Sequence, residues 1–272
     1  MDVSMWASLS AAAEEPPSIP LAPQDLVGKG KIIGFFSVAS GAGATTLACL
    51  TALAAAEEGM DVALADLAPR GRARTYLGLT SDVCPASVLD VAAISAPEEI
   101  GKAGVLHPRK IFVVPGVARA LDAPQVTAAL AVKVLALLKN SFNTVVAVLG
   151  PVHANGWAAA LVCDALWAVA RPARLDLDFF TDDSDLLGRL GCSGRVRVVL
   201  NQSTLPGGLK EEEAARAIGA TVVLPYIPSI QAGGNKRYLE LPRKLRRTFL
   251  NFLNVPERPP DDGAGRRVGA AS

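Results

Sequence analysis

Composition alone does not indicate a partner for this sequence, because it has almost no excess of charge of either sign. The 272 residues include 27 Lys and Arg against 26 Asp and Glu. A balanced chain of this kind gives no global argument for binding nucleic acid or an anionic membrane. Any partner must therefore be sought in local features.

Cysteine is scarce and long apolar runs are missing. Cys49, Cys84, Cys163 and Cys192 form no C-x-x-C pair, so neither a zinc site nor a redox pair is predicted. Buried, reduced thiols are the expectation. No stretch of about 18 uncharged apolar residues predicts a spanning helix. The first residues also lack the basic flank and apolar run of a secretory signal. Together these features predict a cytoplasmic protein.

Half of the residues are hydrophobic, which is enough for one α/β core and leaves little for a second domain. Residues 1–30 are rich in Ala, Ser and Pro and predict a flexible leader. Residues 31–254 are predicted to form the folded domain. Residues 255–272 are rich in Pro and Gly and predict a disordered tail.

The stretch Ile32–Leu47 reads I-I-G-F-F-S-V-A-S-G-A-G-A-T-T-L and predicts a buried strand, a small-residue turn and a helix. A turn of this kind points backbone N–H groups at an anion on a helix N-terminus. Gly41 and Gly43 allow the backbone angles that such a turn requires. The usual P-loop ends in G-K-[ST], whereas this one continues from Gly43 into Ala44.

Further apolar runs alternate with helical segments along the chain. Strands are predicted at Ile32–Phe36, Asp61–Asp66, Ile111–Pro115, Thr144–Leu149, Ala165–Pro172, Arg195–Asn201 and Val222–Pro225. A long helix is predicted from Ala123 to Leu138, entered through Asp122. This alternation predicts an α/β fold with a doubly wound, mainly parallel sheet flanked by helices on both faces.

The loop resembles that of the deviant Walker A ATPases of the ParA/MinD superfamily, K-G-G-x-G-K-[ST]-[ST]. With Gly43 on the last glycine, Ala39 stands at the signature lysine and Ala44 at the P-loop lysine. Within the superfamily, the G-A-T-T ending most resembles the CpaE/TadZ branch, which is linked to Flp-type (tad) pilus assembly. The resemblance covers about residues 31–253 and implies the same P-loop fold.

Two more motifs of the superfamily are altered. Residues 66–79, D-L-A-P-R-G-R-A-R-T-Y-L-G-L, resemble D-x-D-P-Q-G-N-A-T-x-x-L-G, and the switch aspartate falls on Ala68. The Walker B aspartate aligns with Val148, or with Leu149 after a shift of one residue, so that neither register places an acidic residue on this strand. Asp66 is retained, and two interpretations stay open for it, a carboxylate that caps the next turn or one linked to Mg²⁺.

The resemblance implies a vestigial nucleotide site that binds ATP or ADP with Mg²⁺ weakly, or binds no nucleotide. Its residues would be Gly41, Ala42, Gly43, Ala44, Thr45, Thr46, Asp66 and Asn201. If Mg²⁺ is retained, Thr45 and Asp66 are its ligands, and otherwise no metal is expected. Asn201 either contacts the adenine edge, as in the superfamily, or forms a turn at the strand end.

The last predicted helix is basic and amphipathic. The residues that could contact a membrane or a partner protein are Arg243, Lys244, Leu245, Arg246, Arg247, Phe249 and Phe252. Such a helix can lie on anionic membrane, as in MinD-like proteins. We favour the alternative, in which the apolar face docks on the core and the basic face is solvated.

Two polar features are given structural interpretations. The acidic cluster Thr181–Asp185 is predicted to be a solvated helix start rather than a cation site. His153 is predicted to be an ordinary loop histidine, since the sequence identifies no partner for it, and His107 is interpreted in the same way.

Four positions needed by active members carry Ala39, Ala44, Ala68 and Val148. We therefore expect no enzyme but a pseudo-ATPase, a CpaE/TadZ-like scaffold or localisation factor that forms a homodimer and contacts proteins of a pilus or secretion assembly. The alternative is a MinD or septum-site type switch with residual ATP binding at the inner face of the membrane. A DNA partner is disfavoured by the neutral overall charge.

Overall fold

The computed structural model describes residues 26, 28–79 and 85–254. The predicted disordered tail, nearly all of the predicted leader and Cys84 lie outside these residues. Leu26 and Gly30, at the end of the predicted leader, are buried, and Leu26 belongs to the hydrophobic core. The three other cysteines are buried free thiols. Burial raises the pKa of all three.

One mixed sheet organises the molecule. Its strands are β1 (Lys31–Ser37), β2 (Val62–Asp66), β3 (Val105–Leu106), β4 (Ile111–Val114), β5 (Thr144–Val148), β6 (Ala165–Ala170), β7 (Val196–Leu200) and β8 (Val222–Val223). Their order is β3-β4-β2-β5-β1-β6-β7-β8. All pairs are parallel except β3 with β4, which confirms the predicted sheet.

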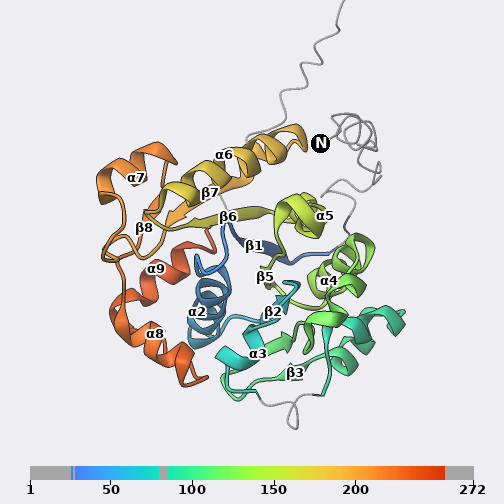
Figure 1. The fold of residues 1–272 in the computed structure, drawn as a ribbon. Coiled ribbons are helices and arrows are strands. Elements are labelled where there is room, and N and C mark those ends of the chain that lie inside the picture. The colour runs from blue at the N-terminus through green and yellow to red at the C-terminus, as the bar shows by residue number, and fades with distance from the viewer. Residues whose placement is uncertain (1–25, 27, 80–84, 255–272) are drawn as a thin grey trace, which may run out of the picture.

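Helices connect the strands and cover both faces of the sheet (Figure 1). The α-helices are α2 (Ala44–Glu57), α3 (Ala73–Tyr76), α4 (Ala128–Ser141), α5 (Trp157–Val162), α6 (Arg174–Arg189), α7 (Glu211–Ala217), α8 (Pro228–Asn235) and α9 (Arg246–Asn251). Short 3-10 segments are η2 (Val88–Ala93), η3 (Pro97–Ala103), η4 (Ala120–Gln125), η6 (Ser193–Arg195) and η7 (Arg243–Leu245), and η5 (Val152–Gly156) is a π-helical turn. No helix of the described ranges is long and apolar enough to cross a membrane.

The core has two layers, one on each face of the sheet. Along β1, Ile32 and Phe36 belong to the layer packed against α4, α5 and α6. Ile33 and Phe35 belong to the layer packed against α2, α3 and α9. Parallel strands buried on both faces read as continuous apolar runs, which is why these strands were recognisable in the sequence.

The predicted helix Ala123–Leu138 is wrong at its start. Pro124 lies inside the separate segment η4, because proline lacks an N–H group and restricts the residue before it. Helix α4 begins at Ala128, five residues after the predicted start, with the Thr127 hydroxyl accepting the Leu130 N–H group at 3.2 Å. The sequence also missed β3, which is only two residues long.

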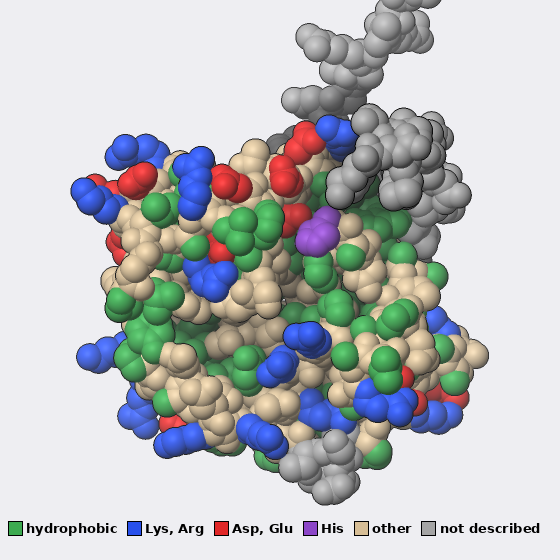
Figure 2. Space-filling view, in the orientation of Figure 1, with side chains coloured by type: hydrophobic (Ala, Val, Ile, Leu, Met, Phe, Trp, Pro, Cys, Tyr) green, Lys and Arg blue, Asp and Glu red, His purple; other side chains and the backbone are tan. Residues whose placement is uncertain are grey.

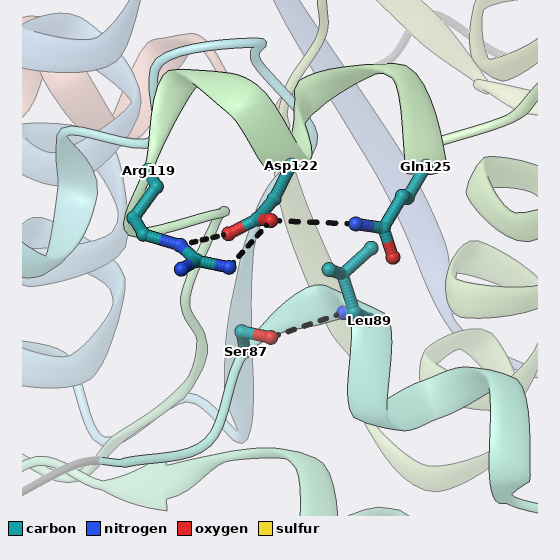
Figure 3. A network of polar contacts seen from close by, with 5 residues as sticks. All are labelled: Ser87, Leu89, Arg119, Asp122 and Gln125. Atoms are coloured by element: carbon teal, nitrogen blue, oxygen red, sulfur yellow. Dashed lines mark hydrogen bonds and ion pairs between the residues drawn. The ribbon is translucent and has the colours of Figure 1, made fainter.

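Asp122 does not begin a long helix but stabilises η4. Its carboxylate accepts hydrogen bonds from Arg119, with Nε and one terminal nitrogen each at 2.9 Å. The Gln125 amide donates to the same carboxylate at 3.3 Å. In Figure 3 the Asp122 side chain lies between these two donors, above the Ser87 hydroxyl that accepts the Leu89 N–H group. The segment preceding α4 is therefore held by its own local contacts.

The acidic cluster was predicted to start a helix, and this prediction is wrong. Thr181–Asp185 lies in the middle of α6, which begins at Arg174 after Ala173. Carboxylates are common in the first turn of a helix, but here the helix has already begun upstream, so Arg174, Asp176 and Asp178 are helical residues too. Asp176 pairs instead with Arg171 just before the helix, at 2.9 Å.

Candidate functional site

A large cavity opens at the carboxyl ends of the central strands, with a volume of about 1860 Å³. Ligands of doubly wound sheets bind at this edge. The cavity is lined by the phosphate loop (residues Ser37–Gly43), the loop after β2, the end of β5, and parts of α6 and α8. Figure 2 shows a hollow near the middle of the molecule with Lys and Arg side chains on its border.

The phosphate loop has the conformation that its glycines predict. Gly41 and Gly43 have φ angles of 86° and 107°, in the left-handed region that favours glycine. The Ser37 hydroxyl accepts the N–H group of Ala44 at 3.2 Å, and helix α2 begins at that residue. The N-terminus of α2 therefore faces the cavity, where its partial positive charge favours an anion.

Asn201 holds this loop from β7. Its side-chain Nδ2 donates to the Ala42 carbonyl at 2.7 Å, and its own backbone N–H bonds to Ala170 at 2.8 Å. The side chain is mostly buried and lines the cavity. Asn201 thus stabilises the phosphate loop. The sequence did not suggest this role, because the hydrogen bond joins residues that are 159 positions apart.

The structure brings together most of the residues named from the sequence. Gly41, Gly43, Ala44, Thr45, Thr46 and Asn201 line the cavity, together with Ala39, Ala68 and Val148. Ala44 and Val148 are buried, with 3% and 1% of their surface exposed. Ala42 is fully buried under the loop. Thus the four apolar residues singled out in the sequence, Ala39, Ala44, Ala68 and Val148, all lie on the cavity wall.

Asp66 differs from the other predicted ligand residues, because its side chain is buried by the surrounding loops and does not line the cavity. It is fully buried, and its carboxylate accepts the N–H groups of Ala68 at 3.2 Å and Ala73 at 2.8 Å. Burial raises its pKa to about 6, although these hydrogen bonds and the charge of Arg74 oppose the shift. Both carboxylate oxygens are therefore occupied in capping the turn that leads into α3.

Asp66 is expected to link stability to pH between about 4 and 6. Its pKa of about 6 in the folded protein exceeds its ordinary value of 3.8. The folded state therefore holds this proton more tightly, so the stabilisation is complete below pH 4 and is lost as the pH rises through 6. We expect the free energy of unfolding to fall by up to about 3 kcal/mol across this range.

Urea denaturation at half-unit steps from pH 4 to 7 measures this dependence. The Asp66→Asn variant cannot ionise at this position and should show a flatter curve. Identical slopes for the two proteins would show that another group carries the linkage.

His153 is 66% exposed, and it has a contact partner that the sequence did not reveal. Its Nδ1 lies 3.4 Å from the Asp183 carboxylate, which is 5% exposed. Burial raises the pKa of Asp183, and the bond to His153 opposes this shift. Both residues line the cavity. Helix α6 thus contributes an acidic wall through Asp182 and Asp183.

His107, by contrast, has a structural environment. Its Nε2 lies 3.0 Å from the Leu77 carbonyl and its Nδ1 accepts the Arg109 N–H group at 3.2 Å. Burial lowers the pKa of this imidazole. The ring joins the turn between β3 and β4 to Leu77, which follows α3.

The positions that the resemblance assigns to Mg²⁺ do not form a set of ligands for it. This ion prefers an octahedral shell built from carboxylates, waters and substrate phosphates. Of those positions, Asp66 is enclosed and Ala68 and Val148 provide no side-chain oxygen, which leaves the Thr45 hydroxyl. The carboxylates that line the cavity, Asp182 and Asp183, are both on α6, where Asp183 lies 3.4 Å from His153. Among the described residues, no group of three or more His, Cys, Asp or Glu side chains is arranged to hold a metal ion.

Arginines of the loop after β2 are the cavity residues that the sequence reasoning missed. Arg70 and Arg72 are exposed and line the same cavity as the phosphate loop. The signal was present in the sequence, since both stand where the superfamily motif carries neutral Gln and Asn. Gln202 and Arg237 also line the cavity and have positive φ angles of 57° and 58°, a strain that often marks functional sites.

The basic C-terminal segment docks on the core, as was favoured from the sequence. Phe249 and Phe252 are fully buried, and the indole N–H of Trp167 donates to the Phe252 carbonyl at 3.0 Å. Arg246 pairs with Glu58 at 2.8 Å. The remaining basic side chains, Arg243, Lys244 and Arg247, are exposed, and Leu245 is half-buried.

Comparison with known proteins identifies the fold. No protein family model and no curated protein sequence matches the chain. A ParA family ATPase from Chlorobium tepidum aligns with a TM-score of 0.70 at 15% identity, covering 83% of this chain and 98% of that chain. The fold is that of the ParA and MinD ATPases.

Two MinD structures agree with this assignment. The septum site-determining protein MinD from Pyrococcus horikoshii, solved with Mg-ADP, aligns with a TM-score of 0.67 at 18% identity, over 82% of this chain and 94% of that one. The MinC:MinD cell division complex of Aquifex aeolicus gives a TM-score of 0.64 at 20% identity, over 77% and 87% of the two chains. At these identities the likeness of the ParA/MinD structures extends to the fold, and function must be argued from the site.

Proposed function

We propose that this protein is a non-catalytic ParA/MinD-like scaffold or localisation factor, of the CpaE/TadZ type, that acts in Flp/tad-type pilus assembly on the cytoplasmic side. The observation that carries the proposal is the apolar character of one shared surface. Ala39, Ala44, Ala68 and Val148 come from three separate segments and all line the same cavity. A fold retained without charged groups at these positions fits a role carried by protein contacts.

The chemistry of phosphoryl transfer supports this proposal. The reaction depends on positioning the phosphates and stabilising the charge of the transition state. A methyl group at Ala44 gives no cation for the phosphates, and Ala68 gives no carboxylate to orient the attacking water. The enclosed Asp66 cannot replace that carboxylate while it accepts the N–H groups of Ala68 and Ala73.

A homodimer and a protein partner are part of the same proposal. In the superfamily, two subunits face each other across the nucleotide, and here the corresponding face is an open cavity bordered by small residues. One structural neighbour is a complex of MinD with MinC, which supports a function exerted through a bound protein. Size measurements on nucleotide-free protein test whether this face pairs without ATP.

MgATP turnover is the direct test. We expect a rate at least about a thousandfold below that of an active ParA/MinD ATPase, because removing even one charge-stabilising group costs about 10² to 10³ in rate. Phosphate release should be measured with the Chlorobium tepidum protein as a positive control. Turnover comparable with that control would refute the pseudo-ATPase proposal.

The alternative function is a MinD or septum-site type switch that binds ATP and attaches to membrane. The retained geometry of the phosphate loop favours residual nucleotide binding. Membrane attachment is less well supported, since Phe249 and Phe252 are buried in the core. Co-sedimentation with anionic liposomes that requires ATP would favour this switch over the scaffold.

A further inference from the structure

In the described part of the chain, arginines and not lysines provide the positive charge on the cavity wall. Arg70 and Arg72 are exposed on its wall, and neither forms an ion pair with another described residue. Arg171, just after β6, differs because its guanidinium is engaged by Asp176, at 2.9 and 3.1 Å. The two arginines therefore keep their hydrogen-bond donors available to a ligand in the cavity.

The backbone that carries these arginines is held on both sides. A Cβ atom on Gly71 would lie 2.6 Å from the Cα atom of Gly116, so the two loops pack backbone against backbone. Just beyond Arg72, the N–H group of Ala73 is bound by the buried Asp66 carboxylate at 2.8 Å. The side chains are exposed while the backbone that carries them is held in place, so binding a ligand does not require this loop to be ordered.

Opposite charges divide the cavity. The phosphate loop and the N-terminus of α2 provide N–H groups on one part of the cavity wall, and Arg70 and Arg72 line the same cavity from the loop after β2. Asp182 and Asp183 lie on the α6 wall, where His153 is the basic group that contacts Asp183. An anion is therefore attracted to the phosphate loop and its arginines and repelled from α6.

We propose that this cavity binds a di- or triphosphate anion without magnesium, with Arg70 and Arg72 as its cations. Guanidinium groups bind phosphate oxygens through paired, charge-assisted hydrogen bonds. They neutralise the ligand where Ala68, Val148 and the enclosed Asp66 give no carboxylate to hold Mg²⁺ against the phosphates. The proposal goes beyond the scaffold function and does not depend on it.

Calorimetric titration tests the proposal with inorganic tripolyphosphate and with ATP, each in EDTA and again in excess Mg²⁺. The site variant is Arg70→Gln/Arg72→Gln. The matched control is Arg216→Gln/Arg247→Gln, which removes two exposed arginines outside the cavity and changes the net charge equally. Urea midpoints of both variants verify that they are folded.

We expect both ligands to bind in EDTA and to lose about tenfold in affinity for each arginine removed, while the control binds as the unaltered protein does. Equal affinities for tripolyphosphate and ATP identify the phosphates as the group recognised, and tighter binding of ATP adds a base contact. The proposal is overturned by absence of binding in EDTA, by binding that requires Mg²⁺, or by an equal loss in the two variants. Turnover of MgATP, in contrast, bears on the scaffold proposal alone.

Discussion

Replacing Phe252 with alanine is expected to lower the free energy of unfolding by about 3 to 5 kcal/mol. The side chain is fully buried and meets the rings of Phe35 and Trp167, with centroid distances of 5.6 and 4.7 Å. Phe249 lies 6.0 Å away on the same segment. The truncation leaves a cavity between α9 and the sheet that these large neighbours cannot fill without moving.

Urea denaturation followed by tryptophan fluorescence measures this loss, since the Trp167 indole is bonded to the Phe252 carbonyl. The matched control is Arg247→Ala, in the same helix but exposed, which should change stability by no more than about 0.5 kcal/mol. A near-neutral Phe252→Ala variant would mean that this segment leaves the core in solution. That result would restore the membrane-helix alternative.

A second large effect is expected at the turn of the phosphate loop. Gly43 has a φ angle of 107°, and an added Cβ atom would lie 2.4 Å from Nδ2 of Asn201. The Gly43→Ala variant thus combines backbone strain with a clash against a side chain that is bonded to Ala42. We expect a loss of about 2 to 5 kcal/mol, since each effect costs about 1 to 3 kcal/mol.

The control for this variant is Gly59→Ala. Gly59 also has a positive φ angle, 76°, but an added Cβ atom would meet nothing within 4 Å. It therefore reports the strain alone, expected at about 1 kcal/mol. If the two variants lose the same stability in urea denaturation, the contact between Asn201 and the loop does not constrain Gly43.

These two sites show how the molecule keeps the architecture of a phosphate-binding protein. The loop is braced from β7 by Asn201, and helix α2 behind it is packed against the sheet together with α9. The chemistry of the cavity wall is set by Ala39, Ala44, Ala68 and Val148 at the four positions discussed above, and by the exposed Arg70 and Arg72 on the loop after β2. A frame of this kind can present a surface or hold an anion without supporting phosphoryl transfer.

The sequence alone was sufficient for the fold and for the frame of the site. Buried parallel strands are continuous apolar runs, so β1, β2, β5 and β6 were recognisable with small errors at their ends. The spacing of Gly41 and Gly43 determined the loop conformation, because only glycine adopts those angles at low cost. Local signals of this kind depend on neighbours in the chain and need no knowledge of distant contacts.

Only the tertiary structure decided which groups are available in the cavity. Asp66 looks the same in sequence whether it is enclosed or presented to a ligand, and its state follows from the packing of the loops around it. His153 acquired a partner 30 residues away, and Asn201 reached a loop 159 residues away. The availability of a charge depends on burial and long-range pairing, so the role of Arg70 and Arg72 became visible only when the folded wall of the cavity was known.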